Sequence, residues 1–191
     1  MMTKNVMIVG VGGQGSLLAS KLLGHLLLEQ GYDVKVSEVH GMSQRGGSVV
    51  TYVRFGDAVY SPIIDRGEAD FIVSFEKLEA ARWMEYLKPG GRVIVNTQEI
   101  DPMPVITGAA QYPADLVEKM RALGAQVDDM DALSLAVQAG SPKAVNLVLM
   151  GRLSRYFEDI PEQAWQDAIT ACVPPKFLEL NRKAFALGRA E

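Results

Sequence analysis

The chain has 191 residues, of which 48% are hydrophobic and 22% charged, a composition typical of a folded globular protein that excludes extensive disorder. Its 19 basic and 23 acidic residues give a formal net charge of -4, which argues against a nucleic-acid-binding module. A single cysteine, Cys172, excludes an internal disulfide and an iron–sulfur cluster held by this chain alone.

Length and patterning together predict one domain covering residues 1–191. The N-terminus shows no apolar run followed by a small-residue cleavage site, and the apolar stretch at 26–28 is too short to cross a bilayer. We therefore expect a cytoplasmic protein without a membrane or nucleic-acid partner. The two histidines, His25 and His40, are too few for most zinc sites, so we predict no metal site.

The N-terminal segment predicts a strand, a tight glycine turn and a helix. Residues 5–11 form a short, β-rich apolar run, and from 16 to 30 the leucines recur at helical spacing. Gly31 stands where a helix C-cap glycine belongs. Residues 34–39 predict a second strand, which we expect to lie parallel to the first in a βαβ unit.

The remaining chain predicts further strands and then a helical C-terminal third. The connection at 99–114, which carries Pro102, Pro104 and Pro113, is predicted to be irregular. Asp131 is predicted as a helix N-cap. Strands are predicted at 49–55, 71–75, 93–96 and 126–130, and helices at 76–87, 115–123, 142–157, 161–173 and 175–187. This order predicts an α/β, Rossmann-like three-layer domain with a mostly parallel sheet and a helical C-terminal third.

The first glycine-rich motif follows the first predicted strand and fits the pattern G-x-G-x-x-G. Such glycines permit a tight turn and a close approach of phosphate to the backbone, and the following helix start favours an anion. An acidic residue ends the second predicted strand, where a ribose-binding carboxylate would lie. Alternatively, these glycines serve only the turn. The cofactor-binding candidates here are Gly10, Gly12, Gly13, Gln14, Gly15 and Glu38.

A second glycine-rich segment, residues 40–47, interrupts all periodicity after the second predicted strand. Its backbone N–H groups, its amide and its guanidinium are the donors that a carboxylate or phosphate requires. If Glu38 pairs with Arg45, both residues are structural, and His40 is more often a hydrogen-bonded loop residue than a catalyst. The candidates in this segment are Ser43, Gln44, Arg45 and Gly46.

Two weaker motifs have ordinary structural explanations. The turn 88–91 (Lys-Pro-Gly-Gly) also occurs in S-adenosylmethionine-dependent methyltransferases, but it is simply good turn chemistry between a helix and a strand. Ser141 and Pro142 predict an N-cap and first helical residue, with Lys143 and Asn146 on one face of the helix. The sequence offers no nucleophile paired with a base, and we predict no catalytic residue.

The two glycine-rich segments together resemble the gamma subunits or domains of the 2-oxoacid:ferredoxin oxidoreductases, and most of all the beta subunits of the indolepyruvate branch. The stretch Gly-Met-Ser-Gln-Arg-Gly-Gly at 41–47 is the specific part. The similarity covers nearly the whole chain and continues through 74–80, 87–96, 143–151, 175–176 and 181–185.

The resemblance implies a smaller subunit of an enzyme that oxidatively decarboxylates 2-oxoacids, here indolepyruvate or another aryl pyruvate, with coenzyme A as acyl acceptor and ferredoxin as electron acceptor. It further implies that thiamine diphosphate, magnesium and [4Fe–4S] clusters belong to a larger alpha subunit. This chain would hold none of them, and its isolated form would be inactive. Its two loops would help to complete the active site and coenzyme A access.

Two alternatives from other classes remain at this point. A free-standing S-adenosylmethionine-dependent methyltransferase accounts for the glycine motif, Glu38 and the turn at 88–91, but gives the segment after Glu38 no role. A nucleotide-binding regulatory module would be a stable monomer or homodimer without an apolar docking surface. The subunit hypothesis predicts such a surface, because obligate interfaces are large and apolar.

Overall fold

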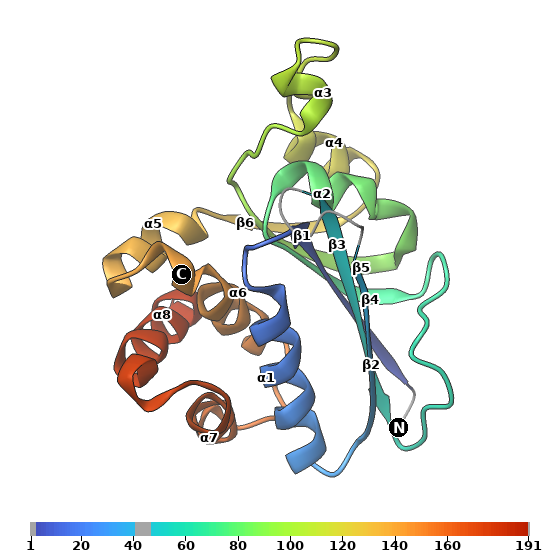
Figure 1. The fold of residues 1–191 in the computed structure, drawn as a ribbon. Helices are drawn as coiled ribbons and strands as arrows, with labels where there is room; N and C mark the ends of the chain where they lie inside the picture. The colour runs from blue at the N-terminus through green and yellow to red at the C-terminus, as the bar shows by residue number, and fades with distance from the viewer. Residues whose placement is uncertain (1–2, 41–46, 191) are drawn as a thin grey trace.

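A computed structural model describes residues 3–40 and 47–190. Its centre is a six-stranded sheet with the spatial order β2-β3-β1-β4-β5-β6 (Figure 1). All six strands match predicted ones. Their bounds are β1 Lys4–Val11, β2 Asp33–His40, β3 Ser48–Gly56, β4 Ala69–Ser74, β5 Leu87–Asn96 and β6 Gln126–Met130.

The sheet is mostly parallel, as predicted, and one strand in its first half, β3, runs in the opposite direction. β1, β4, β5 and β6 pair in parallel, whereas β3 is antiparallel to both β1 and β2. Since β3 is antiparallel to both of its neighbours, β2 runs parallel to β1, as predicted for the βαβ unit. What that prediction lacks is the antiparallel strand β3 between them. The connection 41–47 is far shorter than the dozen or so residues that a parallel crossover needs, so β2 and β3 form a hairpin.

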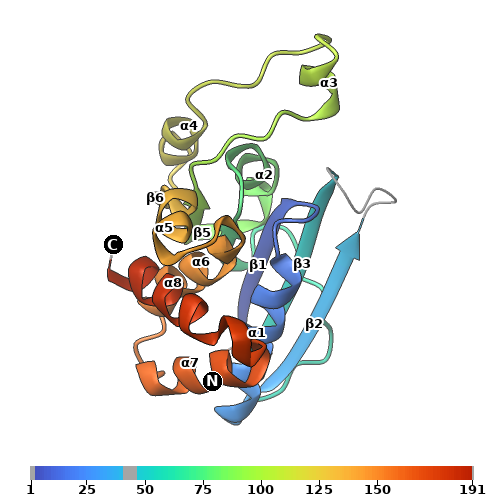
Figure 2. The ribbon, with the colours of Figure 1, turned by 60° about the vertical axis from the view of Figure 1, so that its left-hand side comes forward.

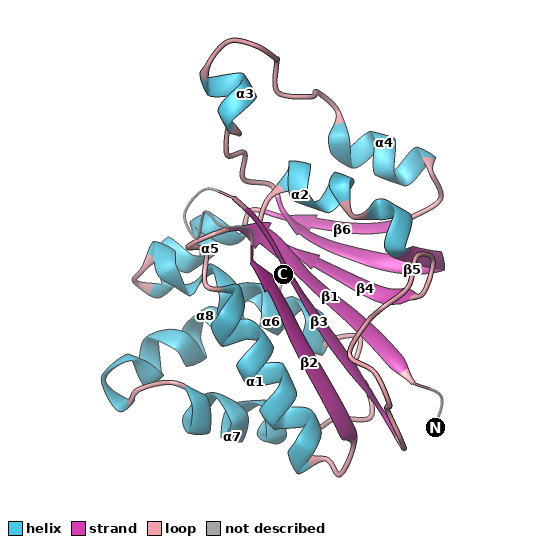
Figure 3. Ribbon diagram, turned by 45° about the vertical axis from the view of Figure 1, so that its right-hand side comes forward, coloured by secondary structure: helices cyan, strands magenta, loops and turns pink. Residues whose placement is uncertain are grey.

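Helices cover both faces of the sheet, giving the predicted three layers (Figure 3). α1 and α5 to α8 lie on one face, and α2 and α4 on the other. The bounds are α1 Ser16–Glu29, α2 Lys77–Arg82, α3 Met103–Ile106, α4 Leu116–Ala122, α5 Ala132–Ala139, α6 Val145–Ser154, α7 Glu162–Cys172 and α8 Leu178–Ala190. No helix in these described segments is both long enough and apolar enough to cross a membrane.

Several predicted helix ends are confirmed. Gly31 follows α1 with φ of +83°, and its N–H donates to the Leu28 carbonyl. Asp131 caps α5 by accepting the Ser134 N–H at 2.9 Å. The predicted helix 76–87 is too long, because α2 stops at Arg82 and a 3-10 turn, Met84–Tyr86, leads into β5.

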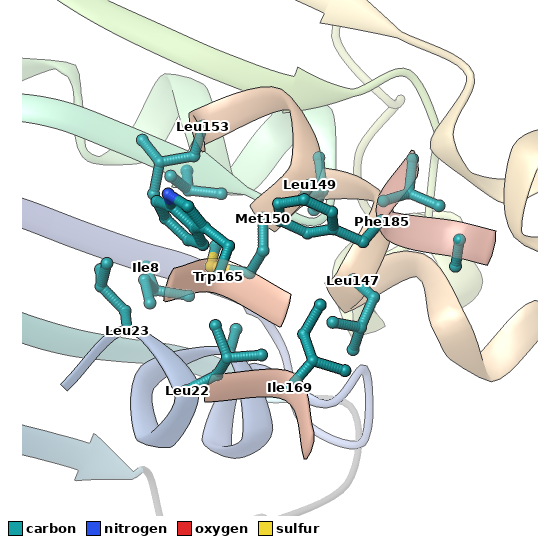
Figure 4. Packing of buried hydrophobic residues seen from close by; sticks show 14 of the residues in the cluster. Ile8, Leu22, Leu23, Leu147, Leu149, Met150, Leu153, Trp165, Ile169 and Phe185 are labelled. Carbon is teal, nitrogen blue, oxygen red and sulfur yellow. The ribbon is translucent and has the colours of Figure 1, made fainter. Parts of the chain in front are cut away.

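The strands of the parallel half are apolar on both sides because both faces are buried. In β1, Val6 and Ile8 face the α1 side, whereas Met7 and Val9 face the α2 side. The α1 side holds the larger core, in which Trp165 of α7 and Phe185 of α8 pack with the leucines of α1 and α6 (Figure 4). The C-terminal helices therefore form a continuous part of the core that supports β1 and α1.

One segment stands away from these layers. Residues 99–114 leave the carboxyl end of β5, carry the short helix α3 and return to α4 (Figure 2). The predicted irregular connection is thus correct, apart from this single turn of helix. We call residues 99–114 the arm.

Candidate functional site

The two glycine-rich segments meet at the carboxyl edge of the sheet. The first links β1 to α1, and the second links β2 to β3. The Gly12 N–H donates to the Gly47 carbonyl at 2.9 Å, which joins the two segments directly. Open α/β sheets bind ligands at the carboxyl ends of their strands, so this edge is the candidate site.

The glycines of the first motif are required by local geometry. A Cβ atom at Gly10 would lie 2.9 Å from the Cβ of Phe75, which follows β4. Gly13 and Gly15 have φ of +99° and +91°, in the region that favours glycine. A Cβ at Gly13 would meet nothing within 4 Å, so Gly13 presents bare backbone to open space.

Gln14 holds the loop together through its side-chain amide. Its Oε1 accepts the Val11 N–H at 2.8 Å, and its Nε2 donates to the Phe75 carbonyl at 3.2 Å. The side chain thus closes the turn after β1 and ties it to the end of β4. Its place among the cofactor-binding candidates stays a prediction, and the contacts shown here are with the protein's own backbone.

An open groove of about 490 Å³ lies beside this loop. Lys143, which is exposed, is the cation among the described residues that line it. The N-terminus of α1 begins at this loop, and Gly15 supplies no side-chain cap, so the positive end of the helix dipole is open to an anion. The lining residues are Gly13, Gln14, Gly15, Gln98, Ile100, Leu133, Pro142, Lys143 and Val145.

Asn146 of α6 supports the glycine loop beside this groove. It is buried at the start of α6, and its Nδ2 donates to the Gly15 carbonyl at 3.3 Å. The predicted N-cap is also confirmed, since the Ser141 Oγ accepts the Lys143 N–H at 3.3 Å. Lys143 and Asn146 therefore both reach the first glycine loop, Lys143 as a groove-lining charge and Asn146 as a support.

Glu38 lies near the carboxyl end of β2, on the sheet face that α1 covers. The Ser20 Oγ of α1 donates to its Oε1 at 3.1 Å. Because β3 separates β2 from β1, Glu38 is not on the strand next to the glycine loop. A ribose-binding role for Glu38 stays a prediction, and its neighbour α1 gives it a structural contact.

Four of the predicted residues, Ser43, Gln44, Arg45 and Gly46, lie outside the described residues. The β3 side of their segment is anchored in the structure. The Ser48 Oγ donates to the Glu79 carboxylate of α2, next to the Gly12 to Gly47 hydrogen bond. The second glycine-rich segment is therefore tied at this end to both α2 and the first glycine loop.

Two buried glutamates behind this edge were missed by the sequence analysis. Glu76 is the N-cap of α2, and its carboxylate accepts hydrogen bonds from the Glu79 N–H, the Ile100 N–H and the Tyr112 hydroxyl. Burial and this bond to Glu76 raise the pKa of Tyr112. Burial also raises the pKa of Glu79. The available signal was the pair of acids three residues apart at a helix start.

The other titratable candidates offer little chemistry. Within the described ranges, no group of three or more His, Cys, Asp and Glu side chains is placed to hold a metal ion. Cys172 lies at the end of α7, where burial raises the pKa of its thiol, so it is a poor nucleophile.

Comparisons with known proteins identify the family. Residues 5–191 match the model of the pyruvate ferredoxin/flavodoxin oxidoreductase family. The chain is 46% identical over 188 residues to the indolepyruvate oxidoreductase subunit IorB of Thermococcus kodakarensis, covering 96% of this chain and 93% of that one. This match is to a subunit of an oxidoreductase over nearly its whole length.

Two solved structures share the fold. The pyruvate oxidoreductase subunit PORC of Thermotoga maritima has a TM-score of 0.78 at 21% identity, covering 100% of this chain and 97% of that one. A 2-oxoglutarate:ferredoxin oxidoreductase from Magnetococcus marinus, solved with 2-oxoglutarate, coenzyme A and succinyl-CoA bound, has a TM-score of 0.74 at 18% identity; all of this chain matches 31% of that chain. The family match does not favour the methyltransferase or the stand-alone nucleotide-binding module. This chain belongs to the pyruvate ferredoxin/flavodoxin oxidoreductase family.

Proposed function

We propose that this chain is the smaller subunit of an oxidoreductase that acts on indolepyruvate or another aryl pyruvate. The observation that carries the proposal is the 46% identity to the Thermococcus kodakarensis indolepyruvate oxidoreductase subunit over nearly the full length of both chains. The reaction converts a 2-oxoacid, coenzyme A and two oxidised ferredoxins into an acyl-CoA, carbon dioxide, two reduced ferredoxins and a proton.

The chemistry of this reaction belongs to the larger partner subunit. Thiamine diphosphate with magnesium supplies carbanion stabilisation when bound, and [4Fe–4S] clusters carry the electrons to ferredoxin. A cluster of that kind takes about four thiolates, and this sequence has one cysteine, so its residues do not fit such a group. The chain holds no cofactor by itself in this proposal.

The role of this chain is to complete the active site and to position coenzyme A. The groove at the first glycine loop combines the open N-terminus of α1, the bare backbone of Gly13 and the ammonium group of Lys143. Backbone N–H groups and a lysine are the donors that a phosphate group requires. Ser43, Gln44 and Arg45, which follow β2 in the sequence, are proposed to face the coenzyme or the partner's active site.

The test is an anaerobic affinity purification of the tagged chain from its own host. We expect a larger subunit to be retained, with iron and thiamine diphosphate in the preparation, and coenzyme A-dependent dye reduction that is faster with aryl pyruvates than with pyruvate or 2-oxoglutarate. A preparation that contains the larger subunit but prefers 2-oxoglutarate would correct the substrate alone. A colourless chain that is recovered without any partner would contradict the subunit proposal.

A further inference from the structure

The arm exposes an apolar helix face at its tip. Met103 and Ile106 are 65% and 64% exposed, and they lie three residues apart on α3, which places them side by side on one face of the turn. Figure 1 and Figure 2 both show α3 standing clear of the sheet and of the helices that cover it. These two side chains therefore point apolar surface outward from the body of the protein.

The base of the arm, in contrast, is firmly attached. On the outgoing side, the Ile100 N–H donates to the buried Glu76 carboxylate at 3.2 Å. On the returning side, the Tyr112 hydroxyl donates to the same carboxylate and accepts the Leu78 N–H at 3.2 Å. Glu76 thus clamps both ends of the arm to the start of α2, and the projecting tip is held in a fixed direction.

The tip has hydrogen bonds within its own turn, such as that from the Thr107 N–H to the Met103 carbonyl, but it buries little apolar surface. Fixing the backbone costs about 1–2 kcal/mol for each residue, which folded segments offset by burying apolar surface. Residues 106–111 are all exposed, as are Met103 and Pro104. Irregular connections longer than about 12–15 residues are uncommon in compact domains and are usually functional or disordered. A clamped base with an apolar tip fits a segment that is buried against another chain.

The charge of the arm indicates the surface that it meets. Residues 99–114 contain Glu99 and Asp101 and no lysine, arginine or histidine. Lys77 pairs with Glu99 at 2.5 Å, whereas no ion pair of Asp101 with a described residue is observed. A complementary surface is therefore an apolar pocket with a basic residue at its rim.

The position of the arm indicates which chain carries that pocket. The arm leaves the carboxyl end of β5, at the same edge as the two glycine loops, and Ile100 lines the groove beside Gly13. In the Magnetococcus marinus enzyme, the matching fold is 31% of a longer chain. An arm at this edge is placed to meet the polypeptide that completes the active site.

We propose that the arm is a docking element, whose apolar tip inserts Met103 and Ile106 into a basic-rimmed apolar pocket of the larger subunit. This inference rests on the proposed function, since it assigns part of the interface of that complex. The clamp at Glu76 fixes the direction of the arm before binding, so that less conformational entropy is lost when the subunits associate.

The test compares the affinity of the larger subunit for variants of the whole chain. Met103→Glu/Ile106→Glu is expected to raise the dissociation constant at least tenfold, without changing the Tm of the isolated chain. The matched control is Leu123→Glu/Val137→Glu, which changes two side chains of similar exposure, 75% and 57%, and leaves the affinity within twofold. Leu123 directly follows α4, and Val137 lies on α5. Asp101→Lys is expected to weaken binding several-fold at low salt and less at high salt.

Each outcome has a defined meaning. If the unaltered chain fails to bind the larger subunit, the proposed function fails and the docking proposal fails with it. If the unaltered chain binds and both double variants bind equally well, only the docking proposal is overturned. It is also overturned if Met103→Glu/Ile106→Glu converts a homodimer of the isolated chain into a monomer while its affinity for the larger subunit is unchanged, because the arm then contacts a second copy.

Discussion

Between α6 and α8 the backbones are so close that a Cβ atom at Gly188 would lie 2.0 Å from the Val148 carbonyl oxygen. At the carboxyl edge of the sheet, a Cβ at Gly13 would meet nothing within 4 Å. Both regions depend on glycine, but in the first it allows two helices to pack and in the second it leaves backbone accessible. The first region packs two helices of the core together, and the second exposes backbone at the edge of the sheet.

The helical layer is also tied to the sheet by a partly buried ion pair. The Arg152 guanidinium of α6 binds the Asp128 carboxylate of β6 through three hydrogen bonds of 2.7 to 2.9 Å, and the Tyr156 hydroxyl donates to the same carboxylate. Burial opposes ionisation of Asp128, but these donors outweigh it and lower its pKa. At the carboxyl edge, burial instead raises the pKa of Glu79. The carboxylate of the helical layer therefore has a lowered pKa, whereas the carboxylate at the edge of the sheet has a raised one.

The largest effect is expected from a substitution between the helices α6 and α8. Gly188→Ala places a methyl group against the backbone of Val148, which has no flexible end that can move aside. We expect a loss near the upper end of the roughly 1–3 kcal/mol that overpacking costs, which lowers Tm by about 6–12 °C. Urea unfolding of the isolated chain measures this loss of stability. Lys183→Ala, on the exposed side of α8, should change stability by no more than about 0.5 kcal/mol.

An unchanged unfolding curve for Gly188→Ala would contradict the close approach of α6 and α8. The same variant also tests whether the two regions are independent. In the folded fraction, assembled with the larger subunit, we expect the KM for coenzyme A to stay within twofold of the unaltered chain, because the substitution lies in the layer and not at the edge.

The second prediction concerns the support of the groove. Asn146→Ala removes the hydrogen bond from Nδ2 to the Gly15 carbonyl and the one that Oδ1 accepts from the Leu147 N–H, and we expect a loss of about 1 kcal/mol in stability. The control, Asn181→Ala, removes a bond from a buried asparagine of α8 to the carbonyl of Phe177, the residue just before α8. Both variants should unfold at similar urea concentrations, so that stability alone does not distinguish them.

The KM for coenzyme A should distinguish the Asn146 variant from the Asn181 variant. In the assembled enzyme, Asn146→Ala is expected to raise the KM for coenzyme A about fivefold, which corresponds to about 1 kcal/mol, with little change in kcat. Asn181→Ala should leave that KM unchanged. Equal KM values for the two variants would show that the carbonyl support of Gly15 has no bearing on coenzyme A, and the groove would lose its proposed role.

The sequence predicted the elements well, but it did not predict the place of β3 in the sheet. Each strand lies in a run of apolar residues such as 5–11, which local patterning detects. The short connection 41–47 makes β3 antiparallel to β2, whereas the place of β3 between β1 and β2 also requires its pairing with β1, which no local pattern encodes. The element list is local information, whereas strand order follows from what the connections can span.

The candidate site divides in the same way. The first glycine motif and the confirmed N-cap at Ser141 have local signatures. The bond from Asn146 to Gly15 joins residues 131 positions apart, and the clamp from Glu76 to Tyr112 joins residues 36 apart, so no local pattern encodes either. The sequence could therefore locate the loop that presents the backbone, but not the buried side chains that hold the loop and the arm in place.

The smallest expected effect concerns the opposite pKa shifts of Asp128 and Glu79. Burial raises the pKa of Glu79 above its value in the unfolded chain. Above that raised pKa the folded state must hold a buried charge, so the stabilising contribution of Glu79 is complete at acid pH and is lost as the pH rises through the folded pKa. Glu79→Gln keeps the shape and removes the charge, and it should stabilise the chain at neutral pH but not near pH 4.

A matched control exists because both glutamates have an arginine three residues away. Glu79 pairs with Arg82, and Glu179 with Arg182 at 3.4 Å, but the Glu179 side chain is 89% exposed. Glu179→Gln should therefore shift stability little and equally at both pH values. Urea unfolding at pH 4 and pH 7.5 measures both variants. An equal stability gain for Glu79→Gln at both pH values would contradict the prediction. It would mean that ionisation of the Glu79 carboxylate does not destabilise the folded chain.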